Sequence, residues 1–285
     1  MSEQTKKGVL YLVSTPIGNL EDITLRALRV MKEVDLIACE DTRRTRILLS
    51  HYGIKTALTS LYDEIERKKG AVLVETMLDG KSLAYVSDAG TPLISDPGYH
   101  LVRGAIEVGI PVVPVPGPSA VVAALSVSGM PSDRFAFFGF LPEKAGRRRS
   151  FLQTLRTLSM TLVFYESPRR LVESLKDIRD VLGNRDVAVT RELTKLYEEV
   201  IRGRVDELIG KLEMQVIKGE ITLLVRGAPE KTEAGDKEIE VLFREMERQG
   251  EFSTRDLAEK IAEALGLPRK RVYNIVLKMR STMQP

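Results

Sequence analysis

The chain has 285 residues, 43% of them hydrophobic and 29% charged, a composition typical of a globular protein with two domains and a smaller third. No apolar run reaches the roughly 18 residues that a membrane span needs, and the polar residues 1–7 indicate no signal peptide. One cysteine and two histidines argue against a disulfide framework or a transition-metal site, so we expect a cytoplasmic protein without a metal.

Strand and helix patterns alternate in the first part of the chain. Apolar runs predict strands at 9–13, 34–39, 83–86 and 112–115. Apolar residues at helical spacing predict helices from about 22 to 31, at 64–78, at 99–108 and from 120 onward. This alternation predicts an α/β fold with a largely parallel sheet.

The pattern changes near residue 135. Residues 135–140 are aromatic and strand-like, and the charged stretch 143–149 predicts a mobile domain junction. Strands at 161–165, 186–190 and 221–225, with helices at 170–181 and 205–212, predict a second α/β domain. A polar linker, 228–236, leads to a helical tail. We therefore predict an N-terminal α/β domain (1–142), a second α/β domain that completes the cleft (143–230), and a small C-terminal helical domain (237–285).

Loops of small residues follow three predicted strands, at 14–19, 87–98 and 115–120. The carboxyl ends of parallel strands share one edge of a sheet, where open α/β proteins bind ligands. The two later loops lack both the Gly-x-Gly-x-x-Gly spacing and a P-loop, so we expect an adenosine-bearing, zwitterionic ligand without a pyrophosphate. The alternative, plain turns between elements, explains a single loop better than three.

Five long motifs resemble the tetrapyrrole-methylase superfamily, and within it the branch that modifies ribosomal RNA of the small subunit. They are STPIGNLEDIT (14–24), EDTR (40–43), SDAGTPLISDPG (87–98), PGPSA (116–120) and RELTK (191–195). The resemblance covers essentially the whole chain. It implies a two-domain methyltransferase that holds a folded S-adenosylmethionine in its cleft. It further implies 2′-O-methylation of a cytidine in 16S rRNA of the 30S subunit, and a homodimer.

The resemblance also implies a set of cofactor contacts. Gly90-Thr91-Pro92 matches the family's Gly-Asp-Pro loop with Thr91 in place of the acid. The first loop lacks the early glycines usual in the family, which suits the RNA branch better than a tetrapyrrole site. The predicted contacts, from the three loops and two strands of the second domain, are Pro16, Ile17, Asp88, Gly90, Thr91, Ile94, Ser119, Ala120, Tyr165 and Thr222.

Methyl transfer to a ribose 2′-hydroxyl needs in-line alignment with the methyl–sulfur bond and a base or a cation near this weak nucleophile. The candidate catalytic residues, among which the sequence does not choose, are the bases Glu40 and Asp41 and the cations Arg191 and Lys195. The alternative for the two cations is an ion pair with Glu192 or Glu198.

Clusters of basic residues predict contacts with RNA phosphates. They are Arg43, Arg44 and Arg46 after the second strand, Arg147, Arg148 and Arg149 at the junction, and Arg269, Lys270 and Arg271 in the tail. The tail reads as a helix–turn–helix, with Ser253 or Thr254 as the first cap, Gly266 at its end and Pro268 starting the next helix. The alternatives are a solvated surface for the arginine runs and a packing bundle for the tail.

Two other functions compete with rRNA methylation. A methylase of a small, precorrin-type tetrapyrrole uses the same fold, but it needs neither arginine runs nor a helix–turn–helix. An RNA-binding assembly factor that has lost catalysis has no need of intact small-residue loops. Both alternatives remain open at the level of the sequence.

Overall fold

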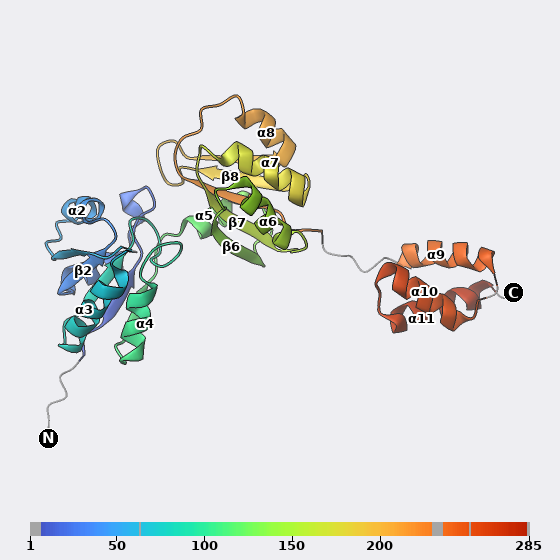
Figure 1. The fold of residues 1–285 in the computed structure, drawn as a ribbon, viewed down its shortest axis with the longest axis horizontal. Coiled ribbons are helices and arrows are strands. Elements are labelled where there is room, and N and C mark those ends of the chain that lie inside the picture. The colour runs from blue at the N-terminus through green and yellow to red at the C-terminus, as the bar shows by residue number, and fades with distance from the viewer. Residues whose placement is uncertain (1–6, 63, 230–235, 251, 284–285) are drawn as a thin grey trace, which may run out of the picture. The chain divides into compact units, whose positions relative to one another are not determined.

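The computed structural model describes residues 7–62, 64–229, 236–250 and 252–283 (Figure 1). The chain forms two compact units, residues 1–227 and residues 228–285, and each is described by itself. Residues 230–235 of the predicted linker lie outside the described residues.

The first sheet has five parallel strands in the order β3-β2-β4-β1-β5. The strands are β1 (Leu10–Val13), β2 (Leu36–Cys39), β3 (Leu58–Ser60), β4 (Leu83–Val86) and β5 (Val112–Val115). β4 is buried at every position, as expected for the central strand of a parallel sheet covered on both faces. Because β4, β1 and β5 are neighbours, the three small-residue loops leave the same edge of the sheet side by side.

Helices cover both faces of this sheet and build a separate core on each. They are α1 (Leu25–Glu33), α2 (Thr42–His51), α3 (Glu66–Leu78) and α4 (Tyr99–Glu107), with a short 3-10 helix η1 (Leu20–Asp22) before α1. Val30 of α1 and Leu49 of α2 belong to one core, whereas Leu73 of α3 and Leu101 of α4 belong to the other. Figure 1 shows α3 and α4 side by side.

The second sheet is mixed, with the order β6-β7-β10-β8-β9. Its strands are β6 (Phe135–Phe140), β7 (Thr161–Glu166), β8 (Asp186–Arg191), β9 (Glu199–Arg204) and β10 (Ile221–Val225). Only the β6–β7 pair is parallel among these described strands. The helices α6 (Ala145–Leu155), α7 (Leu171–Leu182) and α8 (Val205–Leu212) pack on one face, and α5 (Ala120–Ser128) packs on the other.

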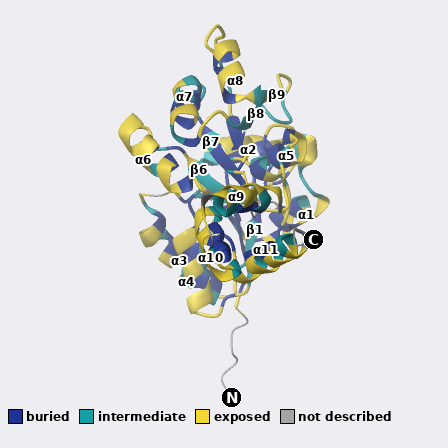
Figure 2. Ribbon diagram, turned by 90° about the vertical axis from the view of Figure 1, so that its right-hand side faces the viewer, coloured by how far each residue is buried: buried dark blue, intermediate teal, exposed yellow. Residues whose placement is uncertain are grey.

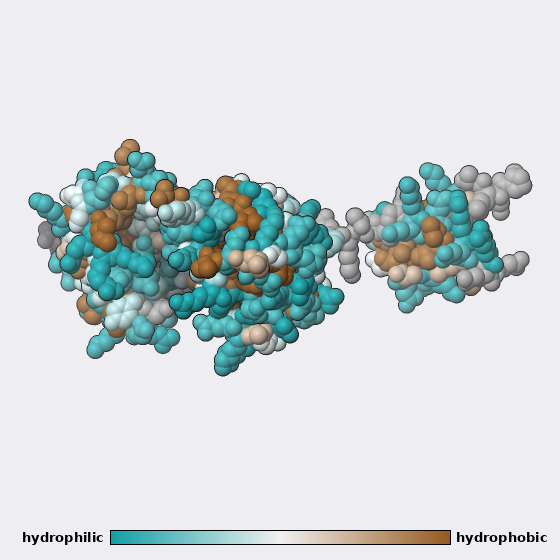
Figure 3. All heavy atoms as spheres, turned by 90° about the horizontal axis from the view of Figure 1, so that it is seen from above, coloured by the Kyte–Doolittle hydropathy of each residue, from teal (hydrophilic) through white to brown (hydrophobic). Residues whose placement is uncertain are grey.

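Buried and exposed residues separate as this layering requires. In Figure 2 the strands are largely dark blue, whereas the outward faces of α6 and α8 are yellow. The face of the molecule in Figure 3 is mainly hydrophilic with small hydrophobic patches. None of the described helices is both long and apolar enough to cross a membrane.

The predicted α/β class is confirmed, and the local predictions need four corrections. α1 begins at Leu25 rather than near 22, because the Thr24 hydroxyl accepts a hydrogen bond from the Ala27 N–H (3.0 Å) and caps the helix. α2, β3 and β9 were not predicted, because β3 is short and α2 and β9 are rich in charge. β6 pairs with β7, so it belongs to the second sheet and not to the N-terminal domain. Finally, the charged stretch 143–149 leads into α6 instead of forming a mobile junction.

A buried ion pair holds α6 on α7 and removes Arg148 from the predicted RNA contacts. The side chains of Arg148 and Asp177 are 5% and 4% exposed, with Nη2 and Oδ2 2.6 Å apart. The other Asp177 oxygen accepts from Arg149 Nε at 2.5 Å. A guanidinium so deeply buried is not accessible to an RNA phosphate.

The second unit is a bundle of α9 (Asp236–Gln249), α10 (Thr254–Leu265) and α11 (Arg269–Met283). Phe243, Leu257, Ile261 and Val276 are fully buried in its core. The predicted boundaries are confirmed: Ser253 caps α10 in a capping box with Asp256, and the turn after α10 has Gly266 at φ +65°.

We expect Asp177→Ala to lower the free energy of unfolding by about 3 to 5 kcal/mol, because the Arg148 guanidinium would stay buried without its counter-ion. Asp180→Ala is the matched control, since Asp180 is 44% exposed in its pair with Arg149 and should cost less than about 1 kcal/mol. Denaturant unfolding followed by circular dichroism measures both. Equal losses in the two variants would contradict the assignment.

Candidate active site

A cavity of about 360 Å³ lies against the loops of both sheets, within the size range of small-molecule sites. The first sheet contributes loop residues, and the second contributes strand ends and the loops beside them. The lining residues are Ile17, Ala89, Gly90, Thr91, Ile94, Ser95, Asp96, Ser119, Ala120, Phe140, Tyr165, Glu166, Ser167, Pro168, Thr190, Leu193, Gly219, Glu220, Ile221 and Thr222.

Hydroxyl and backbone hydrogen bonds tie the three small-residue loops together. The Ser14 hydroxyl donates to Thr91 Oγ1 (3.3 Å), and the Thr91 hydroxyl donates to the Pro118 carbonyl (3.1 Å). Thr15 and Gly90 exchange two backbone hydrogen bonds of 2.9 and 3.0 Å. The loops after β1, β4 and β5 therefore form one connected wall of the cavity.

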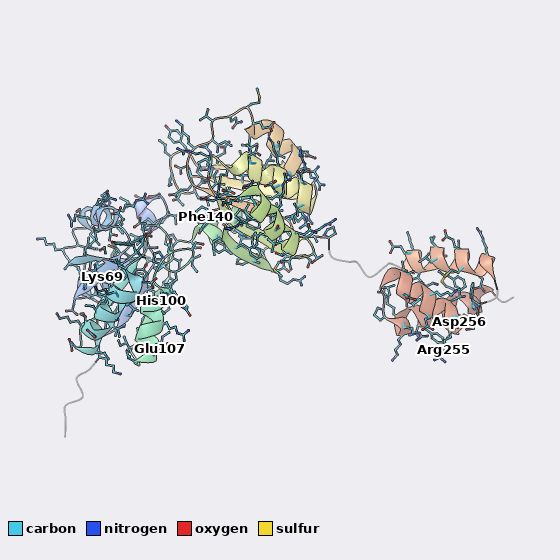
Figure 4. The ribbon with its side chains drawn as sticks, viewed as in Figure 1. Lys69, His100, Glu107, Phe140, Arg255 and Asp256 are labelled. Atoms are coloured by element: carbon cyan, nitrogen blue, oxygen red, sulfur yellow. The ribbon has the colours of Figure 1, made fainter. Side chains whose placement is uncertain are left out.

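The loop after β4 has an unusual backbone that its surroundings hold in place. Leu93 and Ser95 have φ values of +72° and +64°, a conformation that costs free energy in residues with a Cβ and is common at ligand sites. The Tyr85 hydroxyl donates to the Pro97 carbonyl at 2.7 Å. The buried Glu66 carboxylate accepts from the backbone N–H of His100 at 2.6 Å. His100 lies in the first turn of α4 and is labelled in Figure 4.

Aromatic and hydroxyl side chains form the wall that the second sheet contributes. Tyr165 packs against Phe137 and Phe140 at ring-centroid distances of 4.8 and 5.5 Å. Burial, together with the nearby charges of Asp96 and Glu220, raises the pKa of Tyr165 to about 12. Tyr165 therefore remains a neutral phenol throughout the physiological range.

Glu166 is a fully buried carboxylate with every oxygen engaged. It accepts from Arg170 Nη2 at 2.6 Å, from the Ser174 hydroxyl at 2.6 Å and from the Ser167 N–H at 2.7 Å. This network anchors the turn that carries Ser167 and Pro168 into the cavity wall.

The lining residues include the acids Asp96, Glu166 and Glu220, and no lysine, arginine or histidine. Two of the three acids are paired: Arg170 neutralises Glu166, and Lys195 lies 2.9 Å from Glu220. A lining without basic residues disfavours a polycarboxylate ligand and accommodates one with cationic groups.

The two predicted catalytic cations are engaged in ion pairs. Lys195 Nζ lies 2.9 Å from Glu192 Oε1 and 2.9 Å from Glu220 Oε2. Burial alone would lower the pKa of Lys195, but the two carboxylates outweigh it and raise the pKa above its ordinary value. Arg191 pairs with Glu199 at 2.8 Å. The alternative of an ion pair with Glu192 is thus confirmed for Lys195.

The predicted bases lie outside the lining residues. The Asp41 carboxylate caps α2 through the Arg43 N–H (2.8 Å), and its hydrogen bonds to Arg43 lower its pKa to about 2. Asp88 accepts from the Asp41 N–H (3.0 Å) and pairs with Arg44 (3.5 Å). Asp88 thereby joins the loop after β4 to α2 rather than lining the cavity, and Glu40 is also not a lining residue.

The structure brings most predicted cofactor residues together. All of them line the cavity except Pro16 and Asp88. Sequence reasoning missed a group of lining residues at or next to the ends of strands of the second sheet: Phe140, Glu166, Ser167, Pro168, Thr190, Leu193, Gly219, Glu220 and Ile221. Their position at strand ends is a usable signal, but the antiparallel pairing that gathers them was not predicted.

The predicted RNA contacts differ in their pairing and their exposure. Some are paired with carboxylates, namely Arg43, Arg44, Arg148, Arg149 and Arg269. Arg46, Arg147 and Lys270 are exposed, with no acidic partner among the described residues. Arg271, on α11, is half-buried.

The fold is that of a known class of transferases. The crystal structure of uroporphyrin-III-C-methyltransferase from Thermus thermophilus matches with a TM-score of 0.54 and 22% identity, covering 76% of this chain and 94% of that one. Diphthine synthase matches with a TM-score of 0.60 and 15% identity, covering 77% and 90%. A sequence profile described as Tetrapyrrole (Corrin/Porphyrin) Methylases matches residues 9–209. The chain therefore belongs to the tetrapyrrole methylase family.

More similar relatives share one name, Ribosomal RNA small subunit methyltransferase I. The relative from Halalkalibacterium halodurans is 45% identical over 277 residues, covering 96% of each chain. That from Escherichia coli O157:H7 is 46% identical over 282 residues, covering 98% of each. The predicted resemblance to the rRNA branch is confirmed.

We expect Gly18→Ala to destabilise the contact between the loop after β1 and the loop after β8. A Cβ at Gly18 would lie 2.4 Å from Lys195 Cγ and 2.8 Å from Thr194 Oγ1, so the second loop must move. The cost should be about 1 to 3 kcal/mol, visible as a lower thermal midpoint. Gly210→Ala is the control, because nothing lies within 4 Å of a Cβ there. A midpoint for Gly18→Ala equal to that of the control would contradict this packing.

Proposed function

We propose that the chain transfers the methyl group of S-adenosylmethionine to the ribose 2′-oxygen of a cytidine in 16S rRNA of the small ribosomal subunit. The observation that carries this proposal is the cavity built from small-residue loops, whose lining includes acids and no basic residue. That lining suits a ligand with a sulfonium and an ammonium group, and the volume of the cavity suits one small cofactor. The names of the close relatives support RNA of the small subunit as the acceptor.

In this proposal, residues from both sheets contact the cofactor. Thr91, Ile94, Ser119 and Ala120 would hold the methionine end, together with Ile17 and Gly90. Tyr165 and Thr222 would contact the adenine from the second sheet. When bound, S-adenosylmethionine supplies a methyl group already activated by the positive sulfur. The protein must hold the acceptor oxygen in line with that methyl and exclude water.

Among the predicted catalytic residues, Lys195 fits the chemistry best, because its ion-pair partner Glu220 lines the cavity although Lys195 itself does not. Its raised pKa keeps it protonated at neutral pH, so it can stabilise negative charge on the acceptor oxygen but cannot act as a base. Asp41, with a pKa of about 2, is a poor proton acceptor. We therefore propose that alignment and the Lys195 cation contribute more than a base, with Glu40 and Arg191 as secondary candidates.

The remaining parts of the proposal concern partners. Arg46, Arg147 and Lys270 would contact RNA, and the C-terminal bundle would supply a second contact with 16S rRNA or the 30S subunit. We also propose a homodimer that acts in the cytoplasm.

Mass mapping of 16S rRNA from cells with and without this gene tests the acceptor. The expected result is one cytidine that loses a ribose methyl group in the mutant, and purified protein should restore it on 30S subunits or free 16S rRNA. Incorporation into a precorrin-type acceptor instead would support the tetrapyrrole alternative. Absence of S-adenosylmethionine binding by calorimetry would favour the catalytically inactive assembly factor.

We expect Lys195→Ala to slow methyl transfer about 100-fold in single-turnover assays at saturating cofactor, because it removes the cation proposed to stabilise the reacting oxygen. Cofactor affinity should change little. Lys211→Ala on α8 serves as a control for loss of a surface lysine. A wild-type rate in Lys195→Ala would remove this residue from the chemical step.

We expect Asp96→Asn to weaken S-adenosylmethionine binding about 10-fold and to weaken S-adenosylhomocysteine binding less. Both ligands carry an ammonium group, but only S-adenosylmethionine also carries a positive sulfur. A carboxylate in the lining therefore attracts S-adenosylmethionine more strongly than S-adenosylhomocysteine. Titration calorimetry with both ligands measures the difference. Asp133→Asn, a change at a side chain that is 75% exposed, should leave both affinities unchanged, and an equal loss for both ligands in Asp96→Asn would contradict the charge argument.

A further inference from the structure

Two basic residues sit beside the cavity at one edge of the second sheet. Arg169 directly follows the lining residues Ser167 and Pro168, and Lys218 directly precedes the lining residues Gly219 and Glu220. β7 and β10 are antiparallel neighbours, with Glu166 opposite Ile221. Arg169 lies three residues after Glu166, and Lys218 lies three residues before Ile221. The two loops therefore meet the sheet at the same point.

These two cations differ from the others near the lining. Arg170 binds Glu166, Arg191 binds Glu199, and Lys195 binds Glu192 and Glu220. Arg169 and Lys218 are exposed, and neither has an acidic partner among the residues that the structure describes. Arg169 and Lys218 thus carry a charge that is not paired within the described part of the protein, whereas each of the other three cations lies beside a carboxylate.

Hydrogen bonds hold the backbones that present both residues. The Arg170 N–H donates to the Ser167 carbonyl (3.1 Å), closing the turn that contains Arg169, and the Glu166 network anchors that turn. On the other loop, Arg191 Nη1 donates to the Lys218 carbonyl at 3.3 Å. Both cations therefore project from positioned main chain, which lowers the entropic cost of binding.

The chemistry of the proposed acceptor requires such groups. A ribose 2′-oxygen that enters the cavity brings the adjoining 3′-phosphate to its rim, while the lining itself offers carboxylates and no cation. We propose that Arg169 and Lys218 form a binding site for the RNA phosphates that flank the methylated ribose. This inference rests on the proposed function, and it assigns the placement of the acceptor strand to the edge where β7 ends and β10 begins.

The experiment compares Arg169→Gln, Lys218→Gln and the double variant with wild-type full-length protein. Arg226→Gln and Lys211→Gln are the matched controls, since they remove the same charges from exposed positions whose neighbours in the chain do not line the cavity. Methyl transfer to 30S subunits or 16S rRNA is measured over a range of salt concentrations. Titration calorimetry checks that each variant still binds S-adenosylmethionine.

The double variant should raise the KM for RNA about 10-fold or more, with kcat and S-adenosylmethionine affinity close to wild type. The slope of log(kcat/KM) against log salt should become shallower by about 0.7 to 0.9 for each phosphate that is no longer neutralised by a cation of the protein. Variants that keep the slope and KM of the controls would overturn the phosphate site alone. A wild-type protein that binds S-adenosylmethionine but methylates no RNA would overturn the proposed function and this site with it.

Discussion

The hydroxyl group of Thr91 connects the parts of the cavity that the first sheet supplies. It accepts from Ser14 and donates to the carbonyl of Pro118, so a single side chain joins the loops that follow β1, β4 and β5. A hydroxyl can do both at once, whereas an ionised carboxylate at this position would be acceptor-only. The strained backbone at Leu93 and Ser95 depends on this junction and on the anchors at Tyr85 and Glu66.

Electrostatic pairing determines the second half of the site. The protein pairs most cations near the cavity with carboxylates and leaves no basic residue in the lining. Such an arrangement separates two tasks, because a cationic cofactor and a polyanionic acceptor have opposite requirements. The lining residues include acids and no bases, and Arg169 and Lys218, which have no acidic partner among the described residues, lie in loops beside them.

Much of the site was predictable because its residues follow strands. Gly90, Thr91 and Ser119 stand directly after or near strand ends, and parallel strands bring their carboxyl ends to one edge whatever the details of packing. The second wall was less predictable. Glu166 and Glu220 meet in the lining because β7 and β10 run antiparallel, a pairing that no local pattern specifies.

The sequence by itself determined the α/β class, the positions of the ligand loops, the capped helices of the C-terminal bundle and membership of the methylase family. Those properties depend on local periodicity, on turn and cap chemistry and on contiguous motifs. Only the tertiary structure decided the sheet to which β6 belongs, the burial of Arg148 on Asp177 and the capture of Asp88 by Arg44. Each of these depends on contacts between residues that are far apart in the chain. Those contacts decide whether a charged residue is paired within the protein or remains free to bind a ligand.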